Sequence, residues 1–191
     1  MKKLLIVTAI VAILITTNTA FAGGAVKLGF DFPGDHKVSA FGESGTEDVE
    51  AGFSLTGEFF GAINKNVDLG GGLTWQFPRS QKDYPADFYF IPLYAMIRVR
   101  SDSPKTAPYF IGQLGYNLIY DGDTDYTGID EYKFELEGGL YYGIGGGVIL
   151  KNRFLIEILY SVNKGTGSNS YYNVDIDVEY SKFSLLFGVN F

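Results

Sequence analysis

Along most of the chain, apolar side chains occur at every second residue, and this alternation limits what the chain can fold into. From Val67 to Phe77 the odd positions are apolar or glycine, whereas the even positions are polar or glycine. A period of two is typical of a β-strand with one apolar and one polar face. The pattern predicts eight strands, around residues 26–32, 49–59, 67–77, 91–99, 110–120, 136–150, 154–162 and 183–191.

The connections between these segments alternate in length. Residues 62–66, 101–107 and 151–153 form short connections, whereas residues 33–48, 78–87, 121–133 and 163–175 form longer and more polar ones. Short turns at one end and long loops at the other are typical of transmembrane β-barrels, whose tilted strands need about 9–11 residues. The chain is therefore predicted to be all-β, an eight-stranded antiparallel up-and-down transmembrane β-barrel with its termini and short turns on the periplasmic side.

The first 22 residues have the features of a secretory signal peptide. Lys2 and Lys3 precede the apolar stretch 4–15, and Ala20-Phe21-Ala22 has the small-x-small form of a cleavage site. The apolar stretch is shorter than the roughly 20 residues of a membrane-spanning helix. We expect cleavage near Ala22, which leaves residues 23–191 as one outer-membrane β-barrel domain.

Charge and cysteine content narrow the function classes. Residues 1–22 contain two lysines and no acid, so residues 23–191 carry 15 − 2 = 13 basic against 22 acidic side chains, a formal charge of −9. Such a chain is a poor ligand for nucleic acid, which requires clustered basic residues. The sequence has no cysteine, so a secreted domain of this size is expected to be held together by closed sheet pairing.

Alternation alone does not say which face points outward. A soluble lipocalin-like barrel would place its apolar face inside. Three features favour the inverted, membrane arrangement: the polar face is rich in glycine, the chain ends in an apolar strand with a terminal aromatic residue, and aromatic residues occur near strand ends. The aromatic residues near strand ends are Trp75, Phe77, Tyr120, Phe154 and Phe191.

The C-terminal segment carries a family resemblance. Residues 183–191 (FSLLFGVNF), with Phe187 and the final Phe191, resemble the assembly signal of outer-membrane barrels. Residues 109–116 and 143–148 resemble the glycine- and aromatic-rich strands of the small eight-stranded outer-membrane β-barrel family. The resemblance implies an outer-membrane location and contact with membrane lipid, lipopolysaccharide and the barrel-assembly machinery. It also implies a non-enzymatic role, such as envelope integrity, adhesion or passage of small molecules.

Charged residues on the polar face predict a network that fills the lumen. Unpaired charge is costly in a low-dielectric interior, so Arg98 and Arg100 are each expected to find a carboxylate among Glu58, Asp68 and Glu157. The predicted network comprises Lys27, Glu58, Asp68, Arg98, Arg100, Glu157 and Lys182. The acids expected toward the outer mouth are Asp31, Glu50, Glu135 and Glu137. These pairs can form a structural plug that closes the lumen. In the alternative interpretation, the pairs exchange partners and open a narrow path for cations.

Other motifs give weaker signals, and no catalytic group, metal or cofactor is predicted. Asp121, Asp123 and Asp125 resemble the start of a calcium loop, but the positions that an EF-hand fills with glycine and glutamate are Tyr126 and Tyr132. His36 is the single histidine. It has Ser39, Ser44, Glu43 and Glu47 nearby, which leaves a hydrolase site as a minor alternative. The acids Asp175, Asp177 and Glu179 share the parity of the apolar face. They are expected either to stand above the membrane, where the strand edge is open to partners, or to follow a bulge near residues 180–182.

We therefore expect a non-enzymatic outer-membrane protein with a structural or surface-interaction role, contacting partners through its long loops. Two alternatives stay open: a narrow channel for small solutes or small apolar molecules, and a lipid A-modifying enzyme.

Overall fold

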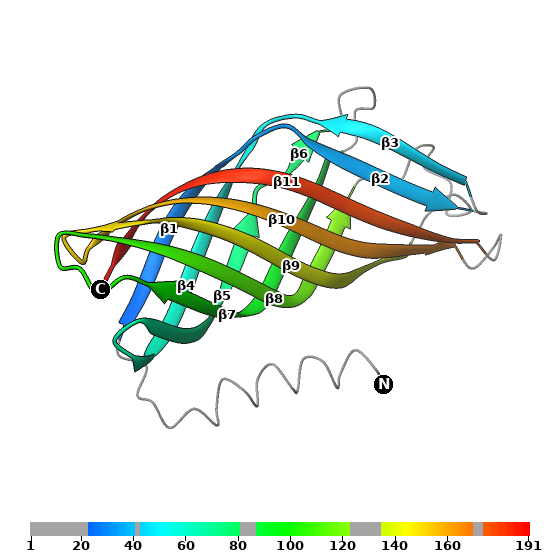
Figure 1. Ribbon diagram of the computed structural model, residues 1–191. Helices are drawn as coiled ribbons and strands as arrows, with labels where there is room; N and C mark the ends of the chain where they lie inside the picture. The colour runs from blue at the N-terminus through cyan, green and yellow to red at the C-terminus, as the bar shows by residue number, and fades with distance from the viewer. Residues whose placement is uncertain (1–22, 41–42, 81–86, 123–134, 170–173) are drawn as a thin grey trace.

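The computed structural model describes residues 23–40, 43–80, 87–122, 135–169 and 174–191. Within these ranges every regular element is a β-strand, and all neighbouring strands pair antiparallel (Figure 1). These same ranges contain no helix that is both long and apolar enough to cross a membrane.

Eight of the described strands form a closed ring, as the alternation predicted. The ring closes because the first strand pairs with the last, from Ala25–Asn190 to Asp31–Ser184. In order around the ring, the strands are β1 (Gly23–Asp31), β4 (Gly52–Asn64), β5 (Val67–Gln76), β7 (Asp87–Arg100), β8 (Thr106–Gly122), β9 (Glu135–Leu150), β10 (Phe154–Asn169) and β11 (Val174–Asn190).

Three further strands occupy segments that the sequence predicted to be loops. β2 (Gly34–Ala40) and β3 (Glu43–Val49) form a hairpin, and β2 pairs with the part of β11 that continues beyond β1. β6 (Arg79–Ser80) is a short strand that pairs with β7. The prediction of one long loop at residues 33–48 was therefore wrong, and so was the loop at 163–175, most of which extends β10 and β11. The reason is that β11, beyond the end of β1, has an edge of backbone N–H and C=O groups with which β2 pairs.

The two ends of the barrel differ. At the first, which we call the turn end, lie the short connections after β4, β7 and β9, and there Gly24 and Phe191 exchange backbone hydrogen bonds of 2.8 and 2.9 Å. Lys151 and Asn152 have φ of 52° and 57°, as the two central residues of a type I′ turn require, and the Arg153 amide closes this turn by donating to the Leu150 carbonyl at 3.0 Å. At the opposite end, which we call the hairpin end, β2 and β3 widen the sheet beyond the ring (Figure 1).

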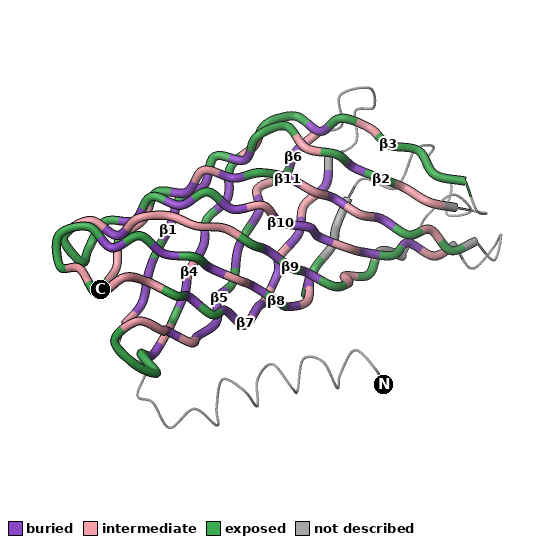
Figure 2. The backbone as a smooth tube through the Cα atoms, viewed as in Figure 1, coloured by how far each residue is buried: buried purple, intermediate pink, exposed green. Residues whose placement is uncertain are grey.

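The apolar face of the ring points outward. Burial alternates along the strands, so that buried and exposed residues follow one another (Figure 2). On β1, Val26 and Leu28 are exposed, whereas Lys27 between them is buried. Phe110 and Ile144 are 78% and 68% exposed, which in water would be unfavourable over so large a surface. The lipocalin-like alternative is therefore excluded, because it would bury this face and expose the charges.

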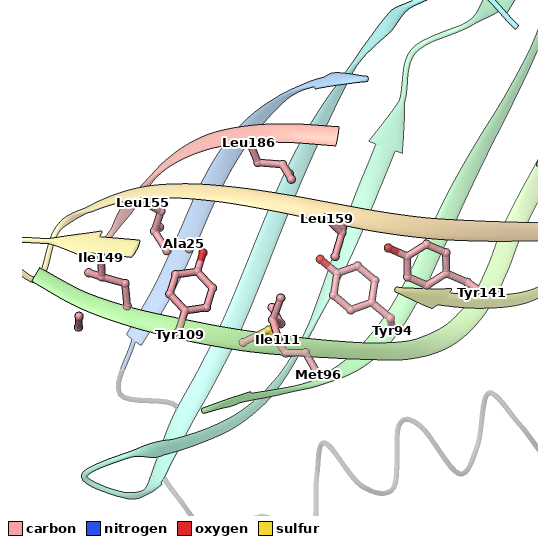
Figure 3. Packing of buried hydrophobic residues seen from close by; sticks show 11 residues of the cluster. Ala25, Tyr94, Met96, Tyr109, Ile111, Tyr141, Ile149, Leu155, Leu159 and Leu186 are labelled. Carbon is pink, nitrogen blue, oxygen red and sulfur yellow. The ribbon is translucent and has the colours of Figure 1, made fainter. Parts of the chain in front are cut away.

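Two apolar clusters lie among the inward-facing residues. The first lies inside the barrel, where the rings of Tyr94, Tyr109 and Tyr141 point into the lumen (Figure 3). The second lies at the hairpin end and contains Val49, Phe88, Phe90, Val178 and Tyr180. Val49, predicted to face outward in the second ring strand, belongs instead to β3 and is buried in this cluster. The hairpin is thus held to the barrel by apolar packing as well as by strand pairing.

Candidate functional site: three charge triads in the lumen

Nine charged side chains inside the barrel form three groups of three, stacked along the barrel axis. In each group one central side chain binds two side chains of opposite charge. From the turn end to the hairpin end, the turn-end triad is Asp68, Arg98 and Arg100, the central triad is Lys27, Glu58 and Glu157, and the hairpin-end triad is Asp31, Arg79 and Lys182. Their side chains come from β1, β4, β5, β6, β7, β10 and β11.

Asp68 is the centre of the turn-end triad. Its Oδ2 accepts hydrogen bonds from Nε and Nη2 of Arg98, at 3.0 and 2.8 Å, and from Nε of Arg100, at 3.1 Å. Asp68 and Arg98 are direct neighbours in the β5–β7 ladder, so strand register brings them together. The guanidinium of Arg98 also lies 4.1 Å from the ring centre of Phe60, a cation–π contact.

Lys27 is the centre of the central triad. Its Nζ donates to Glu58 Oε1 at 2.8 Å and to Glu157 Oε2 at 2.9 Å. Tyr94 donates its hydroxyl proton to Glu58 at 3.1 Å, and Tyr109 donates to Glu157 at 2.7 Å. All three charged side chains are buried, and these extra donors compensate part of the cost of removing two carboxylates from water.

Asp31 is the centre of the hairpin-end triad. Its Oδ2 accepts from Lys182 Nζ and, at 2.8 Å, from Arg79 Nη2. Its Oδ1 accepts from the hydroxyls of Ser184, at 2.6 Å, and Ser54, at 3.2 Å. The carboxylate is fully buried, and both of its oxygens have donors.

The structure brings together the residues of the predicted network and adds two more. Arg98 and Arg100 each contact a carboxylate, but they share Asp68 rather than dividing three acids between them. Asp31 was expected toward the outer mouth with Glu50, whereas it lies inside the lumen because Lys182 and two serines surround it. Arg79 was missed, since Pro78 and a polar surrounding sequence predicted a loop there.

The remaining mouth acids lie at the hairpin end, as strand order requires. Glu50 is exposed between β3 and β4, Glu137 is exposed on β9, and Glu135 begins that strand. Asp121 lies near the end of β8, where its backbone pairs with Tyr89. Asp123 and Asp125 lie outside the described residues. The residues that the structure describes contain no cluster of three potential metal-binding side chains.

The space between the central and hairpin-end triads is almost filled. The void there has a volume of about 10 Å³, and Lys27, Gln113, Glu157 and Lys182 are among the side chains around it. A cavity needs roughly 10–15 Å³ to hold one water molecule. Further along the axis, Gln76 donates to Asn163 across the barrel at 2.9 Å. The described side chains therefore leave no wide path past this level of the lumen.

His36 lies on β2 and is buried at the hairpin end. Its ring lies 4.7 Å from that of Phe88, and burial lowers the pKa of His36 to about 4. Ser39 lies three residues along the same strand and therefore on its opposite face. Ser44 pairs with Ser39, not with His36. The β2–β3 register therefore places neither Ser39 nor Ser44 beside the imidazole.

At the hairpin end, the widened sheet exposes several acidic side chains. Asp175 and Asp177 are exposed on β11, in a β10–β11 ladder whose register is continuous from Asn169–Val174 to Phe154–Val189. No bulge in this ladder changes which face they point to. They therefore keep the outward direction and lie on the part of β11 that continues beyond β1. The predicted open edge of β11 is covered by β2, and the end of the sheet is β3, which exposes Glu43 and Asp48.

The fold defined by this closed ring is that of the small eight-stranded outer-membrane β-barrels. No protein-family model matches the sequence, and no curated protein matches it. The solved structure of outer-membrane protein OprG from Pseudomonas aeruginosa has a TM-score of 0.53 and 14% identity, with 88% of this chain and 95% of OprG aligned.

Two further solved structures align with this chain at lower TM-scores. Ail, the attachment invasion locus protein of Yersinia pestis, aligns with a TM-score of 0.47, 14% identity, and coverage of 88% of this chain and 98% of Ail. Neisserial surface protein A aligns with a TM-score of 0.48, 16% identity, and coverage of 88% and 97%. At these identities the comparisons concern the fold alone, and the closer alignment with OprG carries that conclusion.

Proposed function

We propose that this chain is a non-enzymatic outer-membrane protein with a closed barrel and an acidic hairpin-end surface that contacts partners outside the cell. The filled lumen is the observation that carries this proposal. Three charge triads, of which only Arg100 is partly exposed, cross it, and the void between two of them is about 10 Å³. The outward apolar face supports insertion into a bilayer, with lipid and lipopolysaccharide as its surroundings and the barrel-assembly machinery as its route of insertion.

The hairpin end is the part of the described chain best suited to contact a partner. β2, β3 and the extensions of β10 and β11 form a sheet beyond the closed ring. Exposed acids on this sheet include Asp35, Glu43, Asp48, Asp175 and Asp177. Such a surface favours a basic partner or divalent cations that bridge to lipopolysaccharide phosphates.

Cysteine labelling tests the orientation that this proposal needs. The sequence has no cysteine, so single substitutions give unique labelling sites. A membrane-impermeant maleimide applied to intact cells should label Glu43→Cys at the hairpin end and should not label Lys65→Cys at the turn end. Both positions are exposed, so both should react after the cells are lysed. Labelling of Lys65→Cys alone on intact cells would reverse the proposed orientation.

Current measurements in a planar bilayer distinguish the closed barrel from a narrow channel. The purified protein should show no sustained ion current, and Arg98→Ser should behave in the same way, because the central and hairpin-end triads still close the lumen. A current that increases with Arg98→Ser would instead support a gate formed by the turn-end triad. Mass spectrometry of lipid A from cells with and without the protein should show no difference, which tests the enzyme alternative.

A further inference from the structure

The turn-end triad differs from the hairpin-end triad in how its excess charge is satisfied. Each contains two basic groups and one carboxylate. In the hairpin-end triad, Arg79 also donates to the Tyr180 hydroxyl at 2.7 Å and to the carbonyl oxygens of Phe53 and Phe77. In the turn-end triad, the single oxygen Oδ2 of Asp68 accepts every side-chain hydrogen bond that the two arginines make to described residues.

Several guanidinium N–H groups of this triad therefore lack an acceptor in the described part of the chain. Nη1 of Arg98 is buried without a hydrogen-bond partner there, and the residue as a whole is 1% exposed. Arg100 uses only Nε, which leaves Nη1 and Nη2 available on a side chain that is 27% exposed. A buried charged donor without an acceptor is unfavourable, so an acceptor supplied from outside would be stabilising.

These donors border a cavity at the turn end. The cavity has a volume of about 340 Å³, at the lower end of the roughly 300–1,000 Å³ typical of small-molecule sites. Arg98, Arg100 and Asp68 form its charged side, whereas Phe60, Ile149 and Phe191 form apolar walls. The cavity thus combines net positive charge, unused N–H donors and an apolar surface.

We propose that this cavity binds a small organic oxyanion, a carboxylate or phosphate attached to a short apolar group. The two terminal nitrogens of Arg100 match two oxygens of such a group, and a small movement of Arg98 adds a third donor. The apolar walls accommodate the organic part, and Asp68 orients both arginines. The site is separate from the proposed surface role, because it lies at the opposite end of the barrel. The same chemistry is available from a soluble acid or ester and from the phosphate of a membrane lipid.

Calorimetric titration with phenyl phosphate tests the site. The protein is purified from cell membranes into an uncharged detergent, and inorganic phosphate is titrated in parallel. Phenyl phosphate should bind the wild type more tightly than inorganic phosphate, and Arg100→Gln should weaken its binding at least tenfold. Arg153→Gln is the matched control, since it removes the same charge at the same end without lining the cavity. It should change the affinity less than twofold.

Folding and ligand source are separated by two further measurements. Heat-modifiable electrophoretic mobility shows whether each variant is folded. Arg100→Lys keeps the positive charge but removes the planar pair of N–H donors, so it should also lose most of the affinity. In lipid nanodiscs, phosphatidylglycerol should compete with phenyl phosphate if the ligand is a lipid phosphate, and should not compete if it is soluble; either result supports the site. The proposal fails if the wild type binds no phenyl phosphate in detergent or nanodiscs, or if Arg100→Gln and Arg153→Gln weaken binding equally.

Discussion

At the scale of single residues, the central triad shows how buried charges can fill the lumen without destabilising the barrel. Lys27 is 1% exposed and has a carboxylate on either side, each of which accepts a further hydrogen bond from a tyrosine. Buried ion pairs contribute little net stability compared with apolar packing, but loss of one partner leaves the other charge without compensation. We therefore expect the triads to favour one arrangement of the strands more than to raise the stability of the barrel.

Lys27→Met tests this coupling. The substitution leaves Glu58 and Glu157 buried beside each other with no cation between them, and we expect it to lower the free energy of unfolding by about 3–5 kcal/mol. Urea unfolding in lipid vesicles measures the change. Lys65→Met is the control, because Lys65 is 76% exposed in its contact with Asp102 and should change stability by less than about 1 kcal/mol. Equal effects of the two substitutions would contradict a structural role for the central triad.

A glycine in β5 makes room for the same triad. A Cβ atom at Gly72 would lie 2.7 Å from the Tyr94 hydroxyl and 2.8 Å from Glu58 Cγ, whereas a Cβ at Gly57 on the adjacent strand would meet nothing within 4 Å. We expect Gly72→Ala to cost about 1–3 kcal/mol through overpacking and Gly57→Ala to cost nothing. Urea midpoints of the two variants give the comparison, and a neutral Gly72→Ala would show that Tyr94, Glu58 and the backbone at Gly57 all adjust at little cost.

Apart from Val49, whose predicted outward direction was wrong, the residue-scale predictions from sequence were limited by strand register more than by inward or outward parity. Alternation alone places Asp68 and Arg98 on the inner face, and both are there. Which acid pairs with which base depends on the stagger between strands, which the sequence does not state. Arg79 had no such pattern around it, because its two-residue strand exists only by pairing with β7.

At the scale of elements, the β2–β3 hairpin shows how tertiary pairing overrides local preference. Residues 34–49 contain Gly34, Gly42, Gly45 and several Asp and Ser residues, which are unfavourable in strands and predicted a loop. Gly34–Ala40 and Glu43–Val49 nevertheless form strands, since β11 continues past the end of β1 and its free edge accepts β2. The ring strands, by contrast, are long and strongly periodic and could be predicted from sequence.

His36 reports on the docking of this hairpin. Its pKa of about 4 in the folded protein is below the ordinary value of 6.5, so the docked hairpin favours the neutral ring. Protonation therefore favours the undocked hairpin, and docking should weaken as the pH falls from about 6.5 toward 4, by up to about 3 kcal/mol. Because His36 is the single histidine, its ring resonances in NMR give an unambiguous titration with a midpoint near 4.

A matched pair of phenylalanine variants checks the cause of that shift. Phe88→Ala removes the ring that covers His36 and should move the midpoint upward by more than one pH unit. Phe110→Ala removes a ring that is 78% exposed on the outer face and should leave the midpoint unchanged. A wild-type midpoint near 6.5 would mean that the hairpin is not docked in solution.

At the scale of the whole molecule, the barrel depends on a closure between its first and last strands. β1 pairs with β11 over seven residues, from Ala25–Asn190 to Asp31–Ser184. Beyond that ladder, the backbones of Gly24 and Phe191 exchange two hydrogen bonds at the turn end. The Phe191 ring is 71% exposed, so its side chain contributes little to the packing of the finished barrel.

Removal of Phe191 should therefore affect assembly in cells more than stability of the folded protein. Loss of two terminal hydrogen bonds should cost roughly 1–3 kcal/mol, and the purified variant should refold in detergent with the heat-modifiable mobility of the wild type. If the terminal aromatic residue is read by the assembly machinery, the amount of the variant in outer-membrane fractions should fall severalfold. Phe183→Ala removes an exposed ring from the same strand and is the control, which should insert at near wild-type levels. Equal losses in the two variants would indicate that general hydrophobicity of β11, and not its end, determines insertion; failure to refold without Phe191 would instead place its role in closing the ring.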